Sequence, residues 1–196
     1  MLNLPNILTL SRIAIIPIVL ATFFFDSPAM RWTAVSLFTL AGITDFFDGY
    51  LARRANQVSR LGRFLDPIAD KLLVASVLLM LVGFHRVEEW SYIPAIIILL
   101  REILVSGLRE FLAELRVGLP VTKLAKGKTT VQMIALGFLI VGTTLPLVKP
   151  IGEVLLWMAA LLTLITGYDY LKAGLKHMSG PVRQSPPAPS RSETNP

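Results

Sequence analysis

The sequence predicts an all-α integral membrane protein in which six transmembrane helices surround a polar active-site cavity that faces the cytoplasm. Of its 196 residues, 54% are hydrophobic and 16% are charged, and the mean hydropathy is +0.64. This composition is too apolar for an ordinary soluble domain. The apolar residues form six segments, and the Lys and Arg residues collect between them on one predicted side of a membrane.

The six apolar segments cover residues 7–25, 32–54, 62–84, 91–115, 126–148 and 152–176. Only the fifth contains a long run without charge, residues 129–148, which is long enough to span about 30 Å of hydrocarbon. The other segments combine shorter uncharged runs with a charged end, so each alone would also suit a core helix. Residues 1–178 are expected to form one membrane domain, and the Pro- and Ser-rich residues 179–196 a disordered tail.

The first segment is expected to be an uncleaved helix. Residues 1–11 contain no Lys or Arg, whereas a signal peptide begins with a basic region. Thr9, Ser11 and Arg12 are expected to form a polar entrance to this helix at the membrane surface.

The distribution of basic residues predicts the orientation. With the N-terminus in the cytoplasm and six spans, 16 of the 19 Lys and Arg residues lie inside, as expected for a cell-membrane protein. Both termini and all the charged helix ends then face the cytoplasm, while Trp32, Trp90 and Trp157 lie near the outer ends as interfacial anchors. The net charge of +6 therefore indicates membrane lipids and anionic substrates as partners and not nucleic acid.

Four carboxylates lie in or beside apolar sequence: Asp45, Asp48, Asp66 and Asp70. On helices the first two share one face (i, i+3) and the last two share another (i, i+4). Because one charge at the bilayer centre costs about 2.5–3.5 kcal/mol, four require compensation. Clustered carboxylate oxygens suit Mg²⁺ or Mn²⁺, whereas a chain with no Cys and two His disfavours zinc. The alternative, a carboxylate network that only stabilises the bundle, is disfavoured because buried charges stabilise less than apolar packing.

These residues fit the pattern D-x-x-D-G-x-x-A-R-x8-G-x3-D-x3-D at all eight fixed positions, which resembles the signature of the CDP-alcohol phosphotransferases. The resemblance implies that Asp45, Asp48 and Asp66 hold two Mg²⁺ or Mn²⁺ ions that bind the diphosphate of a CDP-linked donor. It implies that Asp70 is the general base and also touches the metal. The implied positions for binding CDP-diacylglycerol are Asn6, Thr9, Gly49, Ala52, Arg53, Ser59 and Gly62. A helix N-cap would explain Asn6 and Thr9 equally well.

Basic residues of the fourth and fifth segments form a candidate acceptor pocket. Arg101 and Arg109 are two helical turns apart on nearly one face, and Lys126 and Lys128 begin the next segment, so together they would grip a phosphate. Alternatively, the Arg-Glu pairs at these two arginines are structural ion pairs or orientation signals. The R-E-x-x-x-S-x-L-R-E stretch and the K-G-K-T element resemble family members that use glycerol 3-phosphate.

The resemblance covers about residues 3–175 and implies an enzyme of phospholipid biosynthesis. The implied reaction transfers a phosphatidyl group from CDP-diacylglycerol to glycerol 3-phosphate and releases CMP. Two alternatives with the same fold use phosphatidylglycerol, as a cardiolipin synthase does, or an inositol phosphate. An ion transporter with an acidic site would need polar residues across the whole membrane, and the outer halves of the segments lack them. The resemblance also implies a homodimer.

Overall fold

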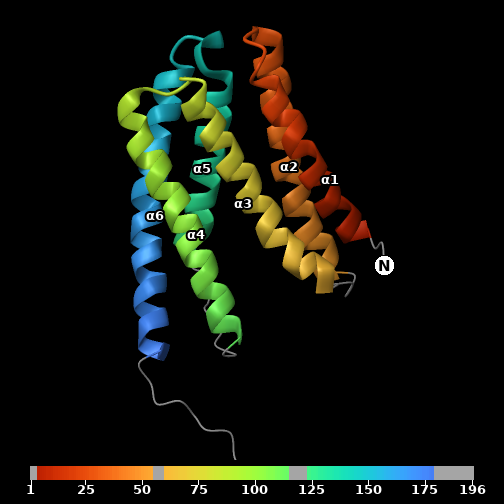
Figure 1. Cartoon of the computed structure of the whole chain (residues 1–196), viewed down its shortest axis with the longest axis vertical. Coiled ribbons are helices and arrows are strands. Elements are labelled where there is room, and N and C mark those ends of the chain that lie inside the picture. Colours follow the sequence, from red (N-terminus) through yellow and green to blue (C-terminus); the bar gives the residue numbers. More distant parts are fainter. Residues whose placement is uncertain (1–3, 55–59, 115–122, 179–196) are drawn as a thin grey trace, which may run out of the picture.

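A computed structural model describes residues 4–54, 60–114 and 123–178. In these ranges every regular element is helical, and six long helices form an up-and-down bundle (Figure 1). The helices are α1 (Leu4–Thr22), α2 (Pro28–Arg54), α3 (Arg60–Gly83), α4 (Tyr92–Glu114), α5 (Lys123–Val141) and α6 (Val148–Met178). Two short 3₁₀ helices, η1 (Glu89–Ser91) and η2 (Gly142–Thr144), precede α4 and follow α5. The all-α prediction is confirmed for these ranges, and residues 179–196 lie outside them.

Local sequence explains where α2 begins and α3 ends. Ser27 caps α2, because its Oγ accepts a hydrogen bond from the Met30 backbone N–H at 3.3 Å, and Pro28 suits the first helical position. After α3, His85 adopts a left-handed φ of 51°. The His85 N–H then bonds the Val82 carbonyl at 3.0 Å, and the Arg86 N–H bonds the Leu81 carbonyl at 2.9 Å. This pair of backbone hydrogen bonds ends α3 and turns the chain sharply.

The predicted uncharged span over residues 129–148 is wrong in its last part. Helix α5 ends at Val141, because Gly142 adopts a left-handed φ of 57° that breaks the helical hydrogen bonding. A turn containing Pro146 follows, and α6 begins at Val148. The run lacks charge throughout, so composition alone does not reveal this break.

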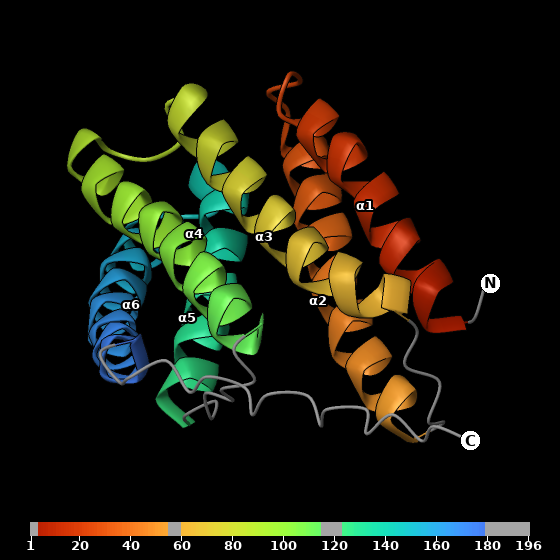
Figure 2. The same ribbon diagram turned by 60° about the horizontal axis from the view of Figure 1, so that its bottom comes forward.

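The bundle consists of two groups of three helices (Figure 2). Helix α1 packs against α2 and α3, helix α6 packs against α4 and α5, and α5 also contacts α2 and α3. The core lies along these contacts and includes the fully buried Leu81, Leu136, Leu139 and Leu156. Gly152 lets α6 approach α5 closely, since a Cβ there would lie 3.0 Å from Leu139. Small residues of this kind favour van der Waals packing between membrane helices.

Large apolar side chains also cover the outer surface. Leu100, Ile103 and Leu161 are each more than 60% exposed. Within the described residues, three stretches are long and apolar enough to cross a membrane: Glu89–Ala113, Leu124–Thr144 and Val148–Leu175. These features support an all-α membrane protein, while the number of spans stays a prediction.

The bundle has two ends that differ in their connections. The α1–α2, α3–α4 and α5–α6 connections lie together at the upper end in Figure 1, which we call the turn end. The start of α3, which carries Asp66 and Asp70, lies toward the lower end, which we call the carboxylate end.

Candidate functional site

Helices α1 and α3 meet at the carboxylate end through a bond between two predicted site residues. Thr9 Oγ1 donates a hydrogen bond to Asp66 Oδ1 at 2.5 Å. Thr9 is 1% exposed, whereas Asp66 is exposed. A short hydroxyl–carboxylate bond is charge-assisted and strongly directional. Thr9 therefore holds one oxygen of Asp66 in place and leaves the other oxygen available to a ligand.

Asp70, one turn further along α3, lies beside an apolar groove of about 920 Å³. Most of the groove lining comes from α2 and α5, and most of it is apolar. Asp70, Thr129 and Thr130 supply polar groups toward the carboxylate end, and Trp32 and Leu145 line the groove toward the turn end. The groove therefore combines an apolar channel with a carboxylate.

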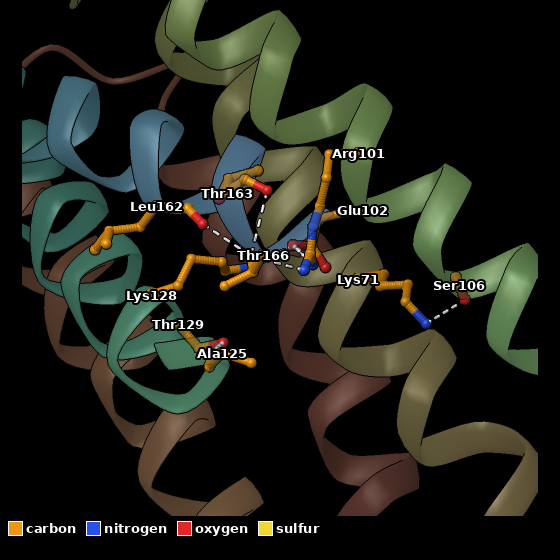
Figure 3. A network of polar contacts seen from close by, with 10 residues as sticks. All are labelled: Lys71, Arg101, Glu102, Ser106, Ala125, Lys128, Thr129, Leu162, Thr163 and Thr166. Atoms are coloured by element: carbon orange, nitrogen blue, oxygen red, sulfur yellow. Dashed lines mark hydrogen bonds and ion pairs between the residues drawn. The ribbon is translucent and has the colours of Figure 1, made fainter. Parts of the chain in front are cut away.

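A polar network joins α4, α5 and α6 (Figure 3). Glu102 accepts a hydrogen bond from Arg101 Nη1 at 3.2 Å and forms an ion pair with Lys128. Arg101 Nη2 also donates to Thr166 Oγ1 at 3.0 Å, and its guanidinium carbon lies 5.8 Å from the centre of the Tyr170 ring. Lys128 is 3% exposed. Two cations share one carboxylate here, so the network keeps an excess of positive charge.

The network lies next to Asp70. Asp70 lines the same groove as Thr129, which directly follows Lys128 in α5. Lys71, which directly follows Asp70, donates a hydrogen bond to Ser106 Oγ at 2.5 Å and so joins α3 to α4. A carboxylate, a groove and a cationic network therefore meet in one region.

The structure brings together only part of the predicted acceptor pocket. Arg101 and Lys128 meet at Glu102, whereas Arg109 and Lys126 are exposed and form no ion pair with described residues. Gly62, a predicted donor-binding position, is buried near the start of α3.

Several predicted positions lie outside the described residues. Helix α2 includes the backbone of Asp45 and Asp48, so their i, i+3 spacing is helical. Their side chains, those of Asn6, Ala52 and Arg53, and the surroundings of Gly49 lie outside the described part of the structure, as does Ser59 altogether. Among the side chains that are described, no three metal-ligating residues gather. The four-carboxylate metal site therefore stays a prediction.

Comparison with known proteins identifies the family. A family model described as CDP-alcohol phosphatidyltransferase matches residues 2–165. The chain belongs to this family.

Several relatives in the CDP-alcohol phosphatidyltransferase family share most of the chain, and all three described here are named CDP-diacylglycerol–glycerol-3-phosphate 3-phosphatidyltransferase. A protein from Rickettsia bellii is 53% identical over 178 residues, which cover 89% of this chain and 97% of the relative. One from Cereibacter sphaeroides is 40% identical, with 90% and 97% covered. One from Shigella flexneri serotype 5b is 42% identical over 173 residues, with 87% and 94% covered.

In this CDP-alcohol phosphatidyltransferase, the sequence did not reveal the hydrogen-bond and ion-pair partners of the predicted site residues. Glu102 was read only as a local pair for Arg101, although it also binds Lys128. Thr166, which accepts a hydrogen bond from Arg101, gives no signal in the sequence, because it is a threonine within an apolar segment. The expected polar entrance at Thr9, Ser11 and Arg12 is wrong for Thr9 and Arg12, since both residues are only 1% exposed, whereas Ser11 is half-buried.

Proposed function

We propose that the chain transfers a phosphatidyl group from CDP-diacylglycerol to glycerol 3-phosphate and releases CMP, as the names of its relatives describe. The observation that carries this proposal is the position of Asp70. This carboxylate lines the apolar groove together with Thr129, which directly follows Lys128 of the cationic network. A lipid donor and a phosphorylated acceptor could thus both reach one candidate base.

The cationic network suits the acceptor. Arg101 and Lys128 carry two positive charges against the single charge of Glu102. The remaining positive charge attracts the phosphate of glycerol 3-phosphate, and Arg and Lys both form charge-assisted bonds to phosphate oxygens. Arg109 and Lys126, which are exposed at the same end, extend this attraction toward the incoming acceptor.

The groove between α2 and α5 suits the donor. Its volume of about 920 Å³ and its apolar lining fit acyl chains, while Asp70, Thr129 and Thr130 lie nearer the headgroup. We assign the cytidine nucleotide of the donor to the positions that the family motif implies, around Thr9, Arg53 and Gly62. The lateral, apolar position of this groove supports a lipid donor over a soluble one.

A hard divalent cation fits the donor set of this site. Asp66 keeps one carboxylate oxygen available beside the oxygen that Thr9 holds, and Asp70 follows on the same face of α3. Asp45, Asp48, Asp66 and Asp70 would hold Mg²⁺ or Mn²⁺, most simply two ions. When bound, the metal would supply positive charge to the donor diphosphate.

The chain's own residues perform the remaining steps. The network holds the acceptor so that its hydroxyl oxygen attacks the phosphorus that carries diacylglycerol. Asp70 takes the hydroxyl proton as the new P–O bond forms and the bond to the CMP oxygen breaks. The surrounding apolar side chains limit the access of water, which would otherwise hydrolyse the donor.

We further propose six membrane spans with both termini and the carboxylate end in the cytoplasm, and a homodimer. The orientation rests on the location of 16 of 19 Lys and Arg residues on that side. The carboxylate end then faces the compartment that supplies soluble glycerol 3-phosphate.

An acceptor screen tests the function. Purified protein receives CDP-diacylglycerol, Mg²⁺ and one acceptor at a time, and CMP release is measured against the Asp70→Asn variant. Release with glycerol 3-phosphate supports the proposal. Release only with phosphatidylglycerol or an inositol phosphate would keep the family chemistry and replace the acceptor, and no release with any acceptor would contradict transferase activity.

A further inference from the structure

A second cavity, of about 300 Å³, lies at the turn end of the bundle, away from Asp70. It is formed by the α1–α2 turn, the connection that follows α3, and the η2–α6 region. Its charged lining residues are Asp26, Arg31, Arg86 and Lys149. Three cations therefore face one carboxylate in a site that the proposed reaction does not use.

Arg86 is the most enclosed of these cations, with 7% of its surface exposed. The left-handed turn at His85 directs the chain so that Arg86 packs over Phe23, with 4.4 Å between its guanidinium carbon and the ring centre. Its Nη2 donates to the Phe23 carbonyl at 3.3 Å, while Nη1 has no hydrogen-bond partner among the described residues. Burial and the nearby Arg31 charge both lower the pKa of Arg86. This cation is therefore incompletely compensated.

Arg31 and Lys149 are held in place by neighbouring turns. Arg31 donates to Asp26 Oδ1 from Nη2 at 2.8 Å and from Nε at 3.2 Å, and it also bonds the Val141 carbonyl at 3.4 Å. Lys149 Nζ donates to Glu88 Oε1 at 2.5 Å. Because three chain reversals fix three cations around one space, the site is preorganised.

The acidic groups nearby do not fill this space. The Asp26 side chain is 78% exposed and pairs chiefly with Arg31, and its distance to Arg86 Nη2 is 3.9 Å. Glu88 pairs with Lys149, and Glu153 accepts the Glu88 backbone N–H at 2.8 Å, but neither residue lines the cavity. Positive charge therefore exceeds negative charge in the lining.

We propose that this cavity binds a phosphate group that carries net negative charge, supplied either by the headgroup of an anionic phospholipid or by a free phosphate ion. A phosphate offers several oxygens that Arg and Lys side chains from different turns can bond at once. The exposed aromatic residues beside the cavity, Phe24, Phe25 and Trp32, match the composition of a membrane–water interface. The proposal is independent of the transferase activity.

Thr143 offers a matched pair of variants for the test. It lines the cavity from η2 and is exposed, so larger side chains are tolerated there. Thr143→Glu places a carboxylate beside the cations and occupies the site from within, whereas Thr143→Gln adds similar volume without charge. Since the carboxylate end also carries cations, only a difference between these two variants reports on this cavity.

The experiment measures the Tm of the full chain in two settings. In detergent, inorganic phosphate is compared with chloride at equal ionic strength. In nanodiscs, phosphatidylcholine alone is compared with a phosphatidylcholine–phosphatidylglycerol mixture. We expect the wild type and Thr143→Gln to gain about 2–4 °C with a ligand present at a few times its Kd. Thr143→Glu is expected to have a higher Tm without ligand and to lose the gain.

Lys149→Gln keeps the test informative if Thr143→Glu misfolds. Removal of one charge-assisted bond should raise the Kd for the responding ligand about tenfold. A response in the nanodisc arm alone assigns the site to lipid headgroups, a response to inorganic phosphate alone assigns it to the free ion, and a response in both assigns it to the phosphate group. Equal responses of the two Thr143 variants, an unchanged Kd in Lys149→Gln, or no response in either arm would overturn the proposal.

Discussion

The two ends of the bundle use the same arrangement, two cations that share one carboxylate, in different environments. At the carboxylate end, Glu102 lies between Arg101 and Lys128, all three come from long helices, and their side chains are 4–17% exposed. At the turn end, Asp26 lies beside Arg31 and Arg86, and its side chain is 78% exposed. Buried charges stabilise poorly, and exposed ion pairs contribute little. The buried set is therefore best explained by function, whereas the ion pairs of the exposed Asp26 contribute little to the stability of the turn end.

The largest expected effect is at Asp70. Asp70→Asn keeps the shape of the side chain but removes the proton acceptor, so transfer should fall by about 10²–10⁴-fold. CMP release measured with saturating substrates reports this loss. Glu153→Gln makes the same carboxylate-to-amide change at the turn end and should retain transfer.

Donor binding separates two roles of Asp70. If Asp70→Asn still binds CDP-diacylglycerol in a metal-dependent manner, the residue acts mainly as the base. Loss of that binding together with transfer would make Asp70 chiefly a metal ligand.

Substitution of Glu102 should disrupt the buried network of Arg101, Glu102 and Lys128. Glu102→Gln leaves Lys128 buried without its counter-charge, which should lower the free energy of unfolding by about 3–5 kcal/mol. The double variant Glu102→Gln/Lys128→Met removes both charges and should recover much of the lost Tm. Because the acceptor phosphate loses one cation in the double variant, its KM should exceed the wild-type value while the donor KM changes little.

The comparison of single and double variants distinguishes a structural network from a functional one. Recovery of both Tm and acceptor KM in the double variant would mean that the network only supports the fold. Failure to recover the Tm would mean that the Glu102–Lys128 pair is not the main source of the instability.

The third prediction concerns the bond between Thr9 and Asp66. Thr9→Val removes the hydroxyl that holds one carboxylate oxygen, and loss of such an orienting partner should lower transfer by about 10–100-fold. Thr9→Ser should retain most activity. Thr22→Val is the matched control, since Thr22 lies in the same helix and its hydroxyl donates a hydrogen bond to the Val19 carbonyl of that helix at 2.6 Å. A similar loss in both valine variants would mean that α1 is merely sensitive to lost hydroxyls.

Sequence reasoning predicted the approximate positions of the six helices, because apolar segments are local signals. It began the second segment at residue 32, whereas α2 begins at Pro28 after the Ser27 cap. It placed the end of the fifth segment wrongly, because the left-handed conformation of Gly142 depends on packing. A Cβ at Gly142 would lie only 2.5 Å from Arg31 Nη1, a contact between residues far apart in the chain.

The sequence predicted which residues belong to the candidate site, but it did not predict which of them contact one another. Thr9 and Asp66 were both identified, but they lie 57 positions apart and no local pattern shows that they bond. Lys128 lies 26 positions from Glu102, so the neighbouring Arg101 was the only partner that spacing indicated. Charge pairs between helices depend on helix rotation, which apolar periodicity determines only coarsely in segments that are apolar on most faces.

The smallest expected effect is on the acid stability of the turn end, through Asp26. The Arg31 hydrogen bonds and charge hold the pKa of Asp26 below its ordinary value of 3.8. An acid with a lowered folded-state pKa stabilises the fold above its unfolded-state pKa, and this contribution is lost as the pH falls through the folded-state value. Asp26→Asn should therefore flatten the fall of Tm between about pH 5 and pH 3, and added salt should reduce the difference from wild type. The effect should be small because Asp26 is exposed, and an unchanged acid profile would show that the Arg31–Asp26 pair contributes nothing to stability.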